Sequence, residues 1–383
     1  MAAVSLNRVE IDLGALRDNY AAIRAVVGPQ ARVMAVVKSD GYGHGMVQVA
    51  RTLREAGAST FGVAEVEEGV RLRESGQNGE IVVLHGVRSG DFDEVVRFRL
   101  TPVVFDRGVL ADLARYAVRR HAMVGVHVKV DVGMGRLGIM PEEVIPFVRA
   151  VDLLEGVYLA GVLSHLPVAD VPASPKTREQ VERFRDVLAR IGRVSPFPKV
   201  GHIANSAALH LIPDAHLDMV RPGIVLYGCD PGGTENLCAE GLRPSALKPA
   251  MTFKTEVLQV KEVPAGYGIS YGHTFVTSRP SRVAVLPVGY ADGYPRRLSS
   301  RAEVLLHGHR APVIGRVCMN ACMVDVTDLP EAIRAGDEVV LMGRQGDGTI
   351  RAEELAGWME TINYEVLCLL GNLNRRVYLE DTR

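Results

Sequence analysis

The sequence predicts an α/β protein with an N-terminal (β/α)8 barrel of the TIM type over residues 1–240 and a mostly antiparallel β domain over residues 241–383. Three observations predict this architecture. The 383 residues can hold a barrel of about 250 residues together with a second domain. Up to residue 230, short β-branched runs alternate with segments of helical spacing. Beyond residue 240 the helical segments nearly vanish.

The first 230 residues contain eight candidate strands, each a short run rich in β-branched residues. They are Val33–Val37, Thr60–Val63, Ile81–Leu84, Thr101–Phe105, Val124–Val130, Gly156–Leu163, Lys199–Ile203 and Leu217–Val220. Helical segments lie between most of them, at Val47–Ala56, Val66–Glu74, Asp93–Arg99, Gly108–Arg119, Pro141–Ala150, Thr177–Ile191 and Asn205–Leu211. Such alternation indicates right-handed βαβ units and a parallel sheet, and eight repeats favour closure into a barrel with an apolar interior.

The stretch GLRPSALKPAM carries two prolines and no clear period, so it is predicted to link the domains. The candidate strands that follow are Thr252–Val263, Arg282–Pro287, Glu303–His307, Pro312–Val317, Met323–Val326 and Glu338–Met342. A single late helix is expected at Ala352–Thr361. Short strands with frequent turns are typical of an antiparallel β domain.

Composition excludes several classes of protein. The apolar share of 47% and the charged share of 23% are those of a globular chain with a large core. The net charge of −1 gives no field that would attract nucleic acid or an anionic membrane. No apolar run approaches the ~18 residues that span a bilayer, and Glu10 and Asp12 interrupt any signal peptide. A cytoplasmic location is therefore expected, with the five cysteines as reduced thiols.

Polar residues follow the candidate barrel strands, at the end where barrel enzymes place their active sites. They are Lys38, His85, Lys129, Asp131, Arg136, His165, His202, Asn205, Ser206, Arg221 and Gly223. Lys, His, Ser and Arg at one rim are the residue types that bind an anionic aromatic cofactor.

Two segments of this rim stand out, and each has two interpretations. In AVVKSDGYGHG, Lys38 is either a lysine whose stem lies along apolar surface, or a desolvated amine that acts as a nucleophile or forms a Schiff base. In GHIANSA and RPGIVLYG, a serine at a helix start and bare glycine amides form either a phosphate cradle or an ordinary N-cap and turn. The lysine segment does not have the spacing of a dinucleotide-binding loop.

These segments belong to a longer series through which the chain closely resembles the alanine racemase family of barrel-type (fold type III) enzymes that use pyridoxal 5'-phosphate (PLP). The series is EIDLGAL, AVVKSDGYGHG, VKVDVGMGRLG, SHL, HIANSA, VRPGIVLYG, GISYGHTF, VGYADGYPR, GRVCMN and NYEV, in the family order and over nearly the whole length. The resemblance implies a PLP-dependent isomerase that interconverts L-alanine and D-alanine in the cytoplasm and supplies D-alanine for peptidoglycan.

The resemblance also implies a role for each matching residue. Lys38 resembles the lysine that holds PLP and Tyr271 the second base. The cofactor-binding group comprises Lys38, Tyr42, His165, Ser206, Arg221, Gly223, Ile224 and Tyr364. Arg136 and Met319 are expected to bind the substrate carboxylate, and Lys129 matches a lysine that is carbamylated in many members. The family forms head-to-tail homodimers in which Tyr271 and Met319 reach the partner's site, so the C-terminal domain is expected to complete the active site of the partner subunit.

The chemistry of racemisation agrees with this set. A proton leaves one face of the α-carbon and another returns to the opposite face, which Lys38 and Tyr271 would serve separately. Arg221 is the most diagnostic residue because an arginine, unlike a carboxylate, cannot keep the pyridine nitrogen protonated. The carbanion would then be less delocalised, which should suppress transamination. A carbamate on Lys129 would turn a cation into an anion that orients Arg136.

Some features differ from the family pattern or allow another interpretation. Asn320 stands where an aspartate is usual, and Pro167 where a small residue is usual, while Asp170 matches an acidic residue near the access corridor.

The alternative functions are a broader amino-acid racemase, for example of serine, a non-catalytic PLP carrier, and a barrel-type decarboxylase. A non-catalytic PLP carrier usually consists of a barrel alone, and a barrel-type decarboxylase is expected to have an acidic residue beside the pyridine nitrogen.

No metal is expected, because the spacing of His307, His309, Cys318 and Cys322 is not a strong zinc signature.

Overall fold

The computed structural model describes residues 5–171, 174–195, 200–232 and 247–380. Cys238 and most of the predicted linker lie outside these residues. The first part of the chain forms a barrel sheet of eight parallel strands in the order β8-β7-β6-β5-β4-β3-β2-β9. The strands are β2 (Arg32–Val36), β3 (Thr60–Val63), β4 (Glu80–Val83), β5 (Thr101–Val104), β6 (Val124–Lys129), β7 (Val157–Leu163), β8 (Val200–His202) and β9 (Met219–Val220). All eight were predicted from the sequence.

The two end strands of this sheet, β8 and β9, approach each other and nearly close the barrel. The amide of Asp218 donates to the carbonyl of Gly201 at 3.2 Å, and the amide of Arg221 donates to the carbonyl of Ala204 at 2.9 Å. The predicted barrel fold is therefore confirmed. Because parallel strands all end at one rim, closure brings the residues after β8 and after β9 together.

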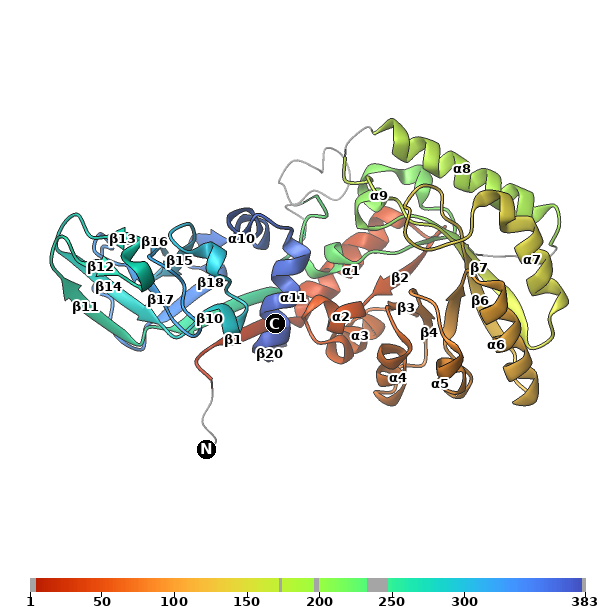
Figure 1. The fold of residues 1–383 in the computed structure, drawn as a ribbon, viewed down its shortest axis with the longest axis horizontal. Coiled ribbons are helices and arrows are strands. Elements are labelled where there is room, and N and C mark those ends of the chain that lie inside the picture. Colours follow the sequence, from red (N-terminus) through yellow and green to blue (C-terminus); the bar gives the residue numbers. More distant parts are fainter. Residues whose placement is uncertain (1–4, 172–173, 196–199, 233–246, 381–383) are drawn as a thin grey trace.

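Helices surround the barrel, and Figure 1 shows α4, α5, α6 and α7 along its outer face. The predicted helices are present as α3 (Met46–Glu55), α4 (Val66–Glu74), α5 (Phe92–Arg97), α6 (Arg107–Arg119), α7 (Val144–Leu153), α8 (Pro175–Gly192) and α9 (Ser206–Leu211). In α6 the buried residues Leu110, Leu113 and Ala117 recur at helical spacing, and the Asp106 side chain accepts from the amide of Val109 to cap the first turn.

The second part of the chain builds a ten-stranded sheet, apart from the barrel (Figure 1). Its main path runs β11-β14-β17-β16-β15-β18-β10-β1-β20, with β19 paired to β18. These strands are β1 (Arg8–Asp12), β10 (Met251–Glu256), β11 (Gln259–Val263), β14 (Ser281–Leu286), β15 (Glu303–Leu306), β16 (His309–Ile314), β17 (Cys322–Asp325), β18 (Glu338–Gln345), β19 (Gly348–Ile350) and β20 (Arg375–Leu379). A separate pair consists of β12 (Gly268–Ile269) and β13 (Phe275–Val276). All pairings are antiparallel except β1 with β20.

The sequence analysis was wrong about one of these strands. The alternating segment Thr252–Val263 is two strands, β10 and β11, because the chain turns away at Val257 and Leu258 to join two different partners. The predicted buried face of β10, with Phe253 and Thr255, is present.

Four elements that join the two parts of the molecule were not predicted. They are β1, α1 (Leu13–Val27), α11 (Asn363–Leu373) and β20. The chain starts in the second sheet, because β1 pairs with β10 and β20 before α1 leads into the barrel. At the other end, α11 follows α10 (Ala352–Met359) and packs against α2 (Lys38–Tyr42) at the barrel mouth. The second domain thereby contributes residues to the barrel rim.

The barrel interior is not wholly apolar, contrary to expectation. His127 in β6 and His202 in β8 are 1% and 0% exposed, and their rings contact each other across the interior. The polar ring atoms are tolerated there because Nδ1 of His127 lies 2.8 Å from Nε2 of His202.

Among the described helices none has both the length and the apolar character needed to cross a membrane.

Candidate active site

A cavity of about 330 Å³ lies at the mouth of the barrel, where the strands end. Most of the predicted rim residues line it, together with Tyr42 from α2 and Tyr364 and Cys368 from α11. Its polar lining residues are Lys38, Ser39, Tyr42, His85, Lys129, Arg136, Ser164, His165, Asn205, Ser206, Arg221, Tyr364 and Cys368. The structure thus gathers residues from positions 38 to 368 of the chain in one place.

Lys38 follows β2 directly, and the backbone after it makes an unusual turn. Ser39, Asp40, Gly41 and Tyr42 all lie in the left-handed region, at φ between 52° and 67°. This conformation costs a non-glycine residue roughly 1–2 kcal/mol, so the three such residues around Gly41 need external support. Backbone strain of this kind is common at functional sites.

Side chains from three parts of the molecule hold this turn. The amide of Ser39 donates to the Glu68 carboxylate at 2.6 Å. The Asp40 carboxylate accepts from the amide of Met46 at 3.1 Å and from the Arg376 guanidinium, in β20, at 2.6 Å. The second domain therefore supports the loop that carries Lys38.

Close packing against α11 gives the turn further support. A Cβ at Gly371 of α11 would lie 2.0 Å from the carbonyl oxygen of Gly43, and a Cβ at Gly43 would lie 2.3 Å from the carbonyl oxygen of Leu367. Neither position has room for a side chain. The two glycines let α11 sit directly on the lysine turn.

Four cationic side chains face the cavity, namely Lys38, Lys129, Arg136 and Arg221, and its described lining contains no carboxylate. Burial, followed by the charge of Arg136, lowers the pKa of Lys38. Burial, followed by the charges of Arg221 and Arg136, lowers the pKa of Lys129 to about 8. Both amines are therefore more readily neutral than a surface lysine, and the cavity as a whole favours an anionic occupant.

Arg221 lies on the floor of the cavity and is 6% exposed. One guanidinium nitrogen, Nη2, donates to the carbonyl oxygen of Ser164 at 2.6 Å, and the other, Nη1, lies 3.1 Å from Nδ1 of His202. Burial lowers the pKa of Arg221 to about 10. The group remains a cation at neutral pH and can donate a hydrogen bond to a ring nitrogen, but it cannot accept one.

His165 stands beside this arginine, with Nδ1 3.4 Å from Nη2 of Arg221. Burial, followed by the charge of Arg221, lowers the pKa of His165 to about 2. A neutral imidazole therefore faces the cavity, as does His85, whose pKa is also lowered by burial and by Lys38.

One end of the cavity is lined by hydroxyl groups. The Ser206 hydroxyl accepts from the amide of Gly223 at 2.8 Å. A Cβ at Gly223 would lie 2.3 Å from the Tyr42 hydroxyl, so only glycine lets that hydroxyl approach the backbone. The rings of Tyr42 and Tyr364 lie 6.1 Å apart. Hydroxyls gathered around a glycine, where the backbone can be approached closely, are suited to bind a phosphate group.

Several predicted residues lie outside the cavity. Ile224 is fully buried behind it in a 3-10 turn. Asp131 accepts from the amides of Gly133, Met134, Gly135 and Arg136 and so shapes the loop that presents Arg136. His202 lies below the floor. Tyr271 and Met319, in the second domain, are 69% and 56% exposed and do not line the cavity of their own chain.

The structure also contains site residues that sequence reasoning missed. Cys368 lines the cavity, and burial raises the pKa of its thiol. Asp40 and Glu68 hold the lysine turn. The first lies in a recognised motif, but nothing in the sequence pattern indicates that Glu68 or Cys368 reaches the barrel mouth.

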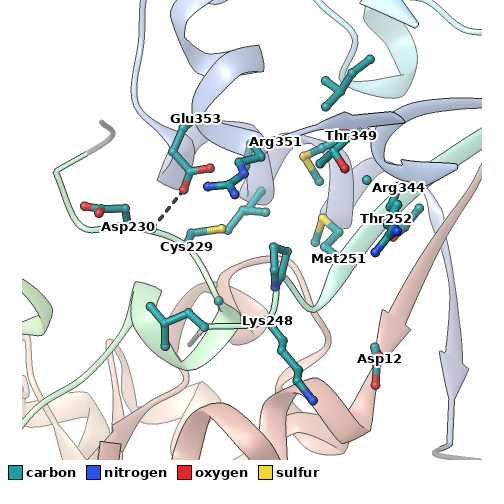
Figure 2. Close-up of a pocket in the computed structure, with 18 residues that line it drawn as sticks. Asp12, Cys229, Asp230, Lys248, Met251, Thr252, Arg344, Thr349, Arg351 and Glu353 are labelled. Carbon is teal, nitrogen blue, oxygen red and sulfur yellow. Dashed lines mark hydrogen bonds between the residues drawn. The ribbon is translucent and has the colours of Figure 1, made fainter. Parts of the chain in front are cut away.

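A second and larger cavity, of about 460 Å³, lies between the barrel and the second sheet (Figure 2). Its lining includes Cys229, Asp230, Lys248, Arg351 and Glu353, and the Glu353 carboxylate accepts from the amide of Asp230 at 3.0 Å. None of the predicted site residues lines it. Within the described residues no cluster of His, Cys, Asp and Glu could hold a metal ion, and His307 instead contacts Glu331 and Asp337.

The residues of the barrel-mouth cavity fit PLP on three counts. Lys38 supplies an amine of lowered pKa, the four cations of the lining suit an anion, and the Gly223 cradle would be filled by any Cβ. A lysine at the mouth of a (β/α)8 barrel, an arginine on the cavity floor and a following β domain together define the class of barrel-type PLP-dependent enzymes.

Comparison with known proteins identifies the member of this class. Residues 11–231 match the family model "Alanine racemase, N-terminal domain", and residues 250–378 match "Alanine racemase, C-terminal domain". The chain belongs to the alanine racemase family. The predicted family, enzyme class, cofactor and function, that of an alanine racemase, are thereby confirmed.

Individual relatives support the assignment over the full length. An alanine racemase of Symbiobacterium thermophilum is 48% identical over 375 residues, which cover 97% of each chain. The crystal structure of alanine racemase from Streptomyces lavendulae is 37% identical, has a TM-score of 0.92, and covers 99% of this chain and 98% of its own. A Bartonella henselae alanine racemase, solved with covalently bound pyridoxal phosphate, is 31% identical with a TM-score of 0.87 and covers 97% of this chain and 99% of its own.

Proposed function

We propose that this protein interconverts L-alanine and D-alanine with two bases, Lys38 and Tyr271, that serve opposite faces of the substrate. The observation that carries the proposal is the placement of Lys38, with its lowered pKa, in one cavity with Arg221 on the floor. Racemisation requires proton removal on one face and proton return on the other, and two groups on opposite faces accomplish this without moving the substrate.

Bound PLP would supply an electron-withdrawing ring conjugated with the substrate amine, which acidifies the α-proton. Lys38 would hold the cofactor and, once released by the substrate amine, would take or return the α-proton at Nζ. Its lowered pKa favours the neutral amine that this role needs. Tyr42, Ser206, Gly223, Ile224 and Tyr364 would bind the phosphate. Ile224 lies behind the cavity, and the other four lie at the cavity end described above.

Arg221 would limit the reaction to racemisation. A guanidinium donates a hydrogen bond to the ring nitrogen without transferring a proton, so negative charge stays close to the α-carbon, where it is readily protonated. His165, held neutral beside Arg221, would contact the ring and link it to the tyrosine base.

Arg136 and the backbone amide of Met319 would bind the substrate carboxylate, with Lys129 as a carbamate beside Arg136. The pKa of about 8 at Lys129 leaves part of the amine neutral near physiological pH, which is the form that reacts with carbon dioxide. The resulting anion would relieve repulsion among the cations around it and would orient Arg136.

The proposal includes a homodimer in which residues 1–240, together with Tyr364, bind the cofactor, and residues 241–383 also complete the partner subunit's active site. Tyr271 and Met319 are largely exposed and lie away from the cavity of their own chain, so a second copy is the natural recipient. We also propose a cytoplasmic location and a biosynthetic role in supplying D-alanine for peptidoglycan.

Two measurements test this function. Purified enzyme should turn over L-alanine far faster than L-serine or L-lysine, and a preference for serine would identify a broader racemase instead. The Lys38→Ala variant should lose both racemisation and the visible absorbance of lysine-bound cofactor. Survival of that absorbance would mean that another residue holds PLP. The same substitution at an exposed lysine of the second sheet, Lys261→Ala, serves as the control.

A further inference from the structure

A continuous series of polar side chains crosses the interior of the barrel from the cavity floor to the opposite rim. Nη1 of Arg221 lies 3.1 Å from Nδ1 of His202. Nε2 of His202 lies 2.8 Å from Nδ1 of His127. Nε2 of His127 lies 3.7 Å from the nearer oxygen of Glu80. Glu80 begins β4, so the series ends at the rim away from the active site.

The series has a single possible proton arrangement while the Arg221 contact is made. A guanidinium only donates, so Nδ1 of His202 is an acceptor and the proton of this neutral ring is on Nε2. That proton is donated to Nδ1 of His127, which places the proton of His127 on Nε2, facing Glu80. All donors therefore point away from the cavity and toward the carboxylate.

The far end of the series is held in place by the barrel rim. The Glu80 carboxylate accepts from the Arg32 guanidinium at 2.7 Å, and Arg32 also donates to the Thr60 hydroxyl at 2.9 Å. Although burial opposes ionisation, the neighbouring His127 ring and the Arg32 guanidinium keep the pKa of Glu80 below its usual value. The carboxylate is thus an anion fixed opposite His127.

The barrel also provides room for the imidazole rings at a specific point. A Cβ on Gly161 of β7 would lie 2.7 Å from Cε1 and 2.8 Å from Nδ1 of His127. Any side chain at that position would push the ring away from His202. The backbone of a neighbouring strand is therefore shaped around this histidine.

We propose that Glu80 and His127 are positioning residues for Arg221, which act from the opposite rim by fixing His202 as a hydrogen-bond acceptor. A carboxylate in direct contact with Arg221 would orient it but would also offset its charge. Two neutral imidazoles orient the guanidinium and keep the anion at a distance, so its charge toward the cavity is preserved. The inference rests on the proposed role of Arg221 toward the ring nitrogen.

The tautomers can be measured directly in holoenzyme labelled with nitrogen-15 histidine. The long-range coupling pattern of each ring separates the Nδ1–H, Nε2–H and doubly protonated forms, and His127→Gln and His202→Gln assign the signals. In the wild type we expect His127 and His202 both as Nε2–H. In Glu80→Leu no carboxylate faces Nε2 of His127, so the proton of this ring is no longer favoured at Nε2 and the Arg221 contact is made only part of the time. We then expect both rings to show a mixture of tautomers. Wild-type rings in any other form would overturn the proposal.

Kinetics supply the second measurement. Glu80→Leu should lower kcat for alanine about tenfold with KM within about twofold, since Arg221 does not bind the substrate carboxylate. Glu74→Leu is the matched control, because it is the same substitution at an exposed glutamate of α4, outside this series. It should keep the wild-type tautomers and kcat within about twofold.

The combined result decides the matter. Altered tautomers with lowered kcat in Glu80→Leu, and neither change in Glu74→Leu, support the proposal, and every other combination overturns it. If Glu80→Leu does not yield folded holoenzyme, Glu80→Gln, which retains an acceptor oxygen, should keep the wild-type tautomers, and the wild-type spectrum remains decisive. Failure of the wild type to racemise alanine would refute the proposed function and leave the tautomer result standing.

Discussion

The chemistry of individual side chains in this protein depends on which neighbours burial gives them. Lys254, on the second sheet, lies 2.9 Å from a Glu10 oxygen and 3.4 Å from a Glu338 oxygen, as a structural lysine does. Lys38 and Lys129 face arginines instead, in a cavity whose described lining has no carboxylate, and their pKa values are lowered. The same side chain is a salt-bridge partner in one place and an amine of lowered pKa in the other.

At this scale, Arg221 provides the sharpest test of reaction specificity. Replacing it in Arg221→Glu should reduce racemisation by about a hundredfold or more, because a preorganised donor is lost, and should increase transamination. The measurement is pyruvate released from L-alanine at equal enzyme concentration. Arg221→Lys, which keeps the cation, should not increase pyruvate. If Arg221→Glu releases no more pyruvate than the wild type, Arg221 does not control the fate of the carbanion.

Most elements could be recognised from local pattern alone. The eight barrel strands and the seven outer helices each carry their own periodicity, so the sequence predicted them within a few residues. The strands β1 and β20 were missed because they have only five residues each and their pairing partners are distant in the chain. The helix α11 was missed because Asn363 and Gly371, on its buried face, interrupt the apolar pattern. Arg376 in β20, for example, contacts Asp40 across 336 positions.

At the scale of elements, the contact between α11 and the lysine turn predicts that Gly371→Ala is destabilising. The added Cβ would lie 2.0 Å from the carbonyl oxygen of Gly43. We expect the free energy of unfolding to fall by about 2 kcal/mol or more, and cofactor retention to weaken, because the strained turn loses its support. Urea unfolding and the visible absorbance after dialysis would measure both effects.

Gly357→Ala in α10 is the matched control for that substitution. A Cβ there meets nothing within 4 Å, and replacing a helical glycine with alanine should raise stability by up to about 1 kcal/mol. Equal effects of the two substitutions would show that α11 does not clamp the turn.

Across the whole molecule, buried histidines make stability dependent on pH. Burial lowers the pKa of His44 and of His210 to about 4 and that of His165 to about 2, whereas an unfolded chain titrates near pH ~6.5. Below that pH the unfolded state binds more protons than the folded one. Stability is therefore fully present above about pH 6.5 and is lost as the pH falls, by up to about 1.4 kcal/mol per pH unit for each such histidine.

Unfolding free energies at pH 7 and pH 5, at one protein concentration, would measure this loss. His210→Leu removes one titrating ring, neither of whose nitrogens has a hydrogen-bond partner among the described residues. Its stability should depend less steeply on pH than that of the wild type. An unchanged slope would mean that His210 does not contribute.

The proposed dimer makes a second prediction at this scale. Lys38→Ala and Tyr271→Phe should each be inactive alone, but a mixed dimer would contain one site with both native bases. With random exchange, half of the dimers are mixed and one of their two sites is intact, so about a quarter of wild-type activity should return. Mixing after verified subunit exchange tests this. No recovery would indicate that each chain completes its own site.

By itself, the sequence determined the two-part architecture, the strand and helix order, and the residues at the barrel mouth, because periodicity and motif order are local properties that the chain carries along its length. Only the tertiary structure decided how these residues work together. The left-handed turn at Lys38 depends on Arg376, Gly371 and Glu68, and the polar series from Arg221 to Glu80 depends on strands that meet only when the barrel closes. Contacts between distant positions leave no periodic pattern, so buried polar partners such as His127 and His202 could be identified only after folding had placed them together.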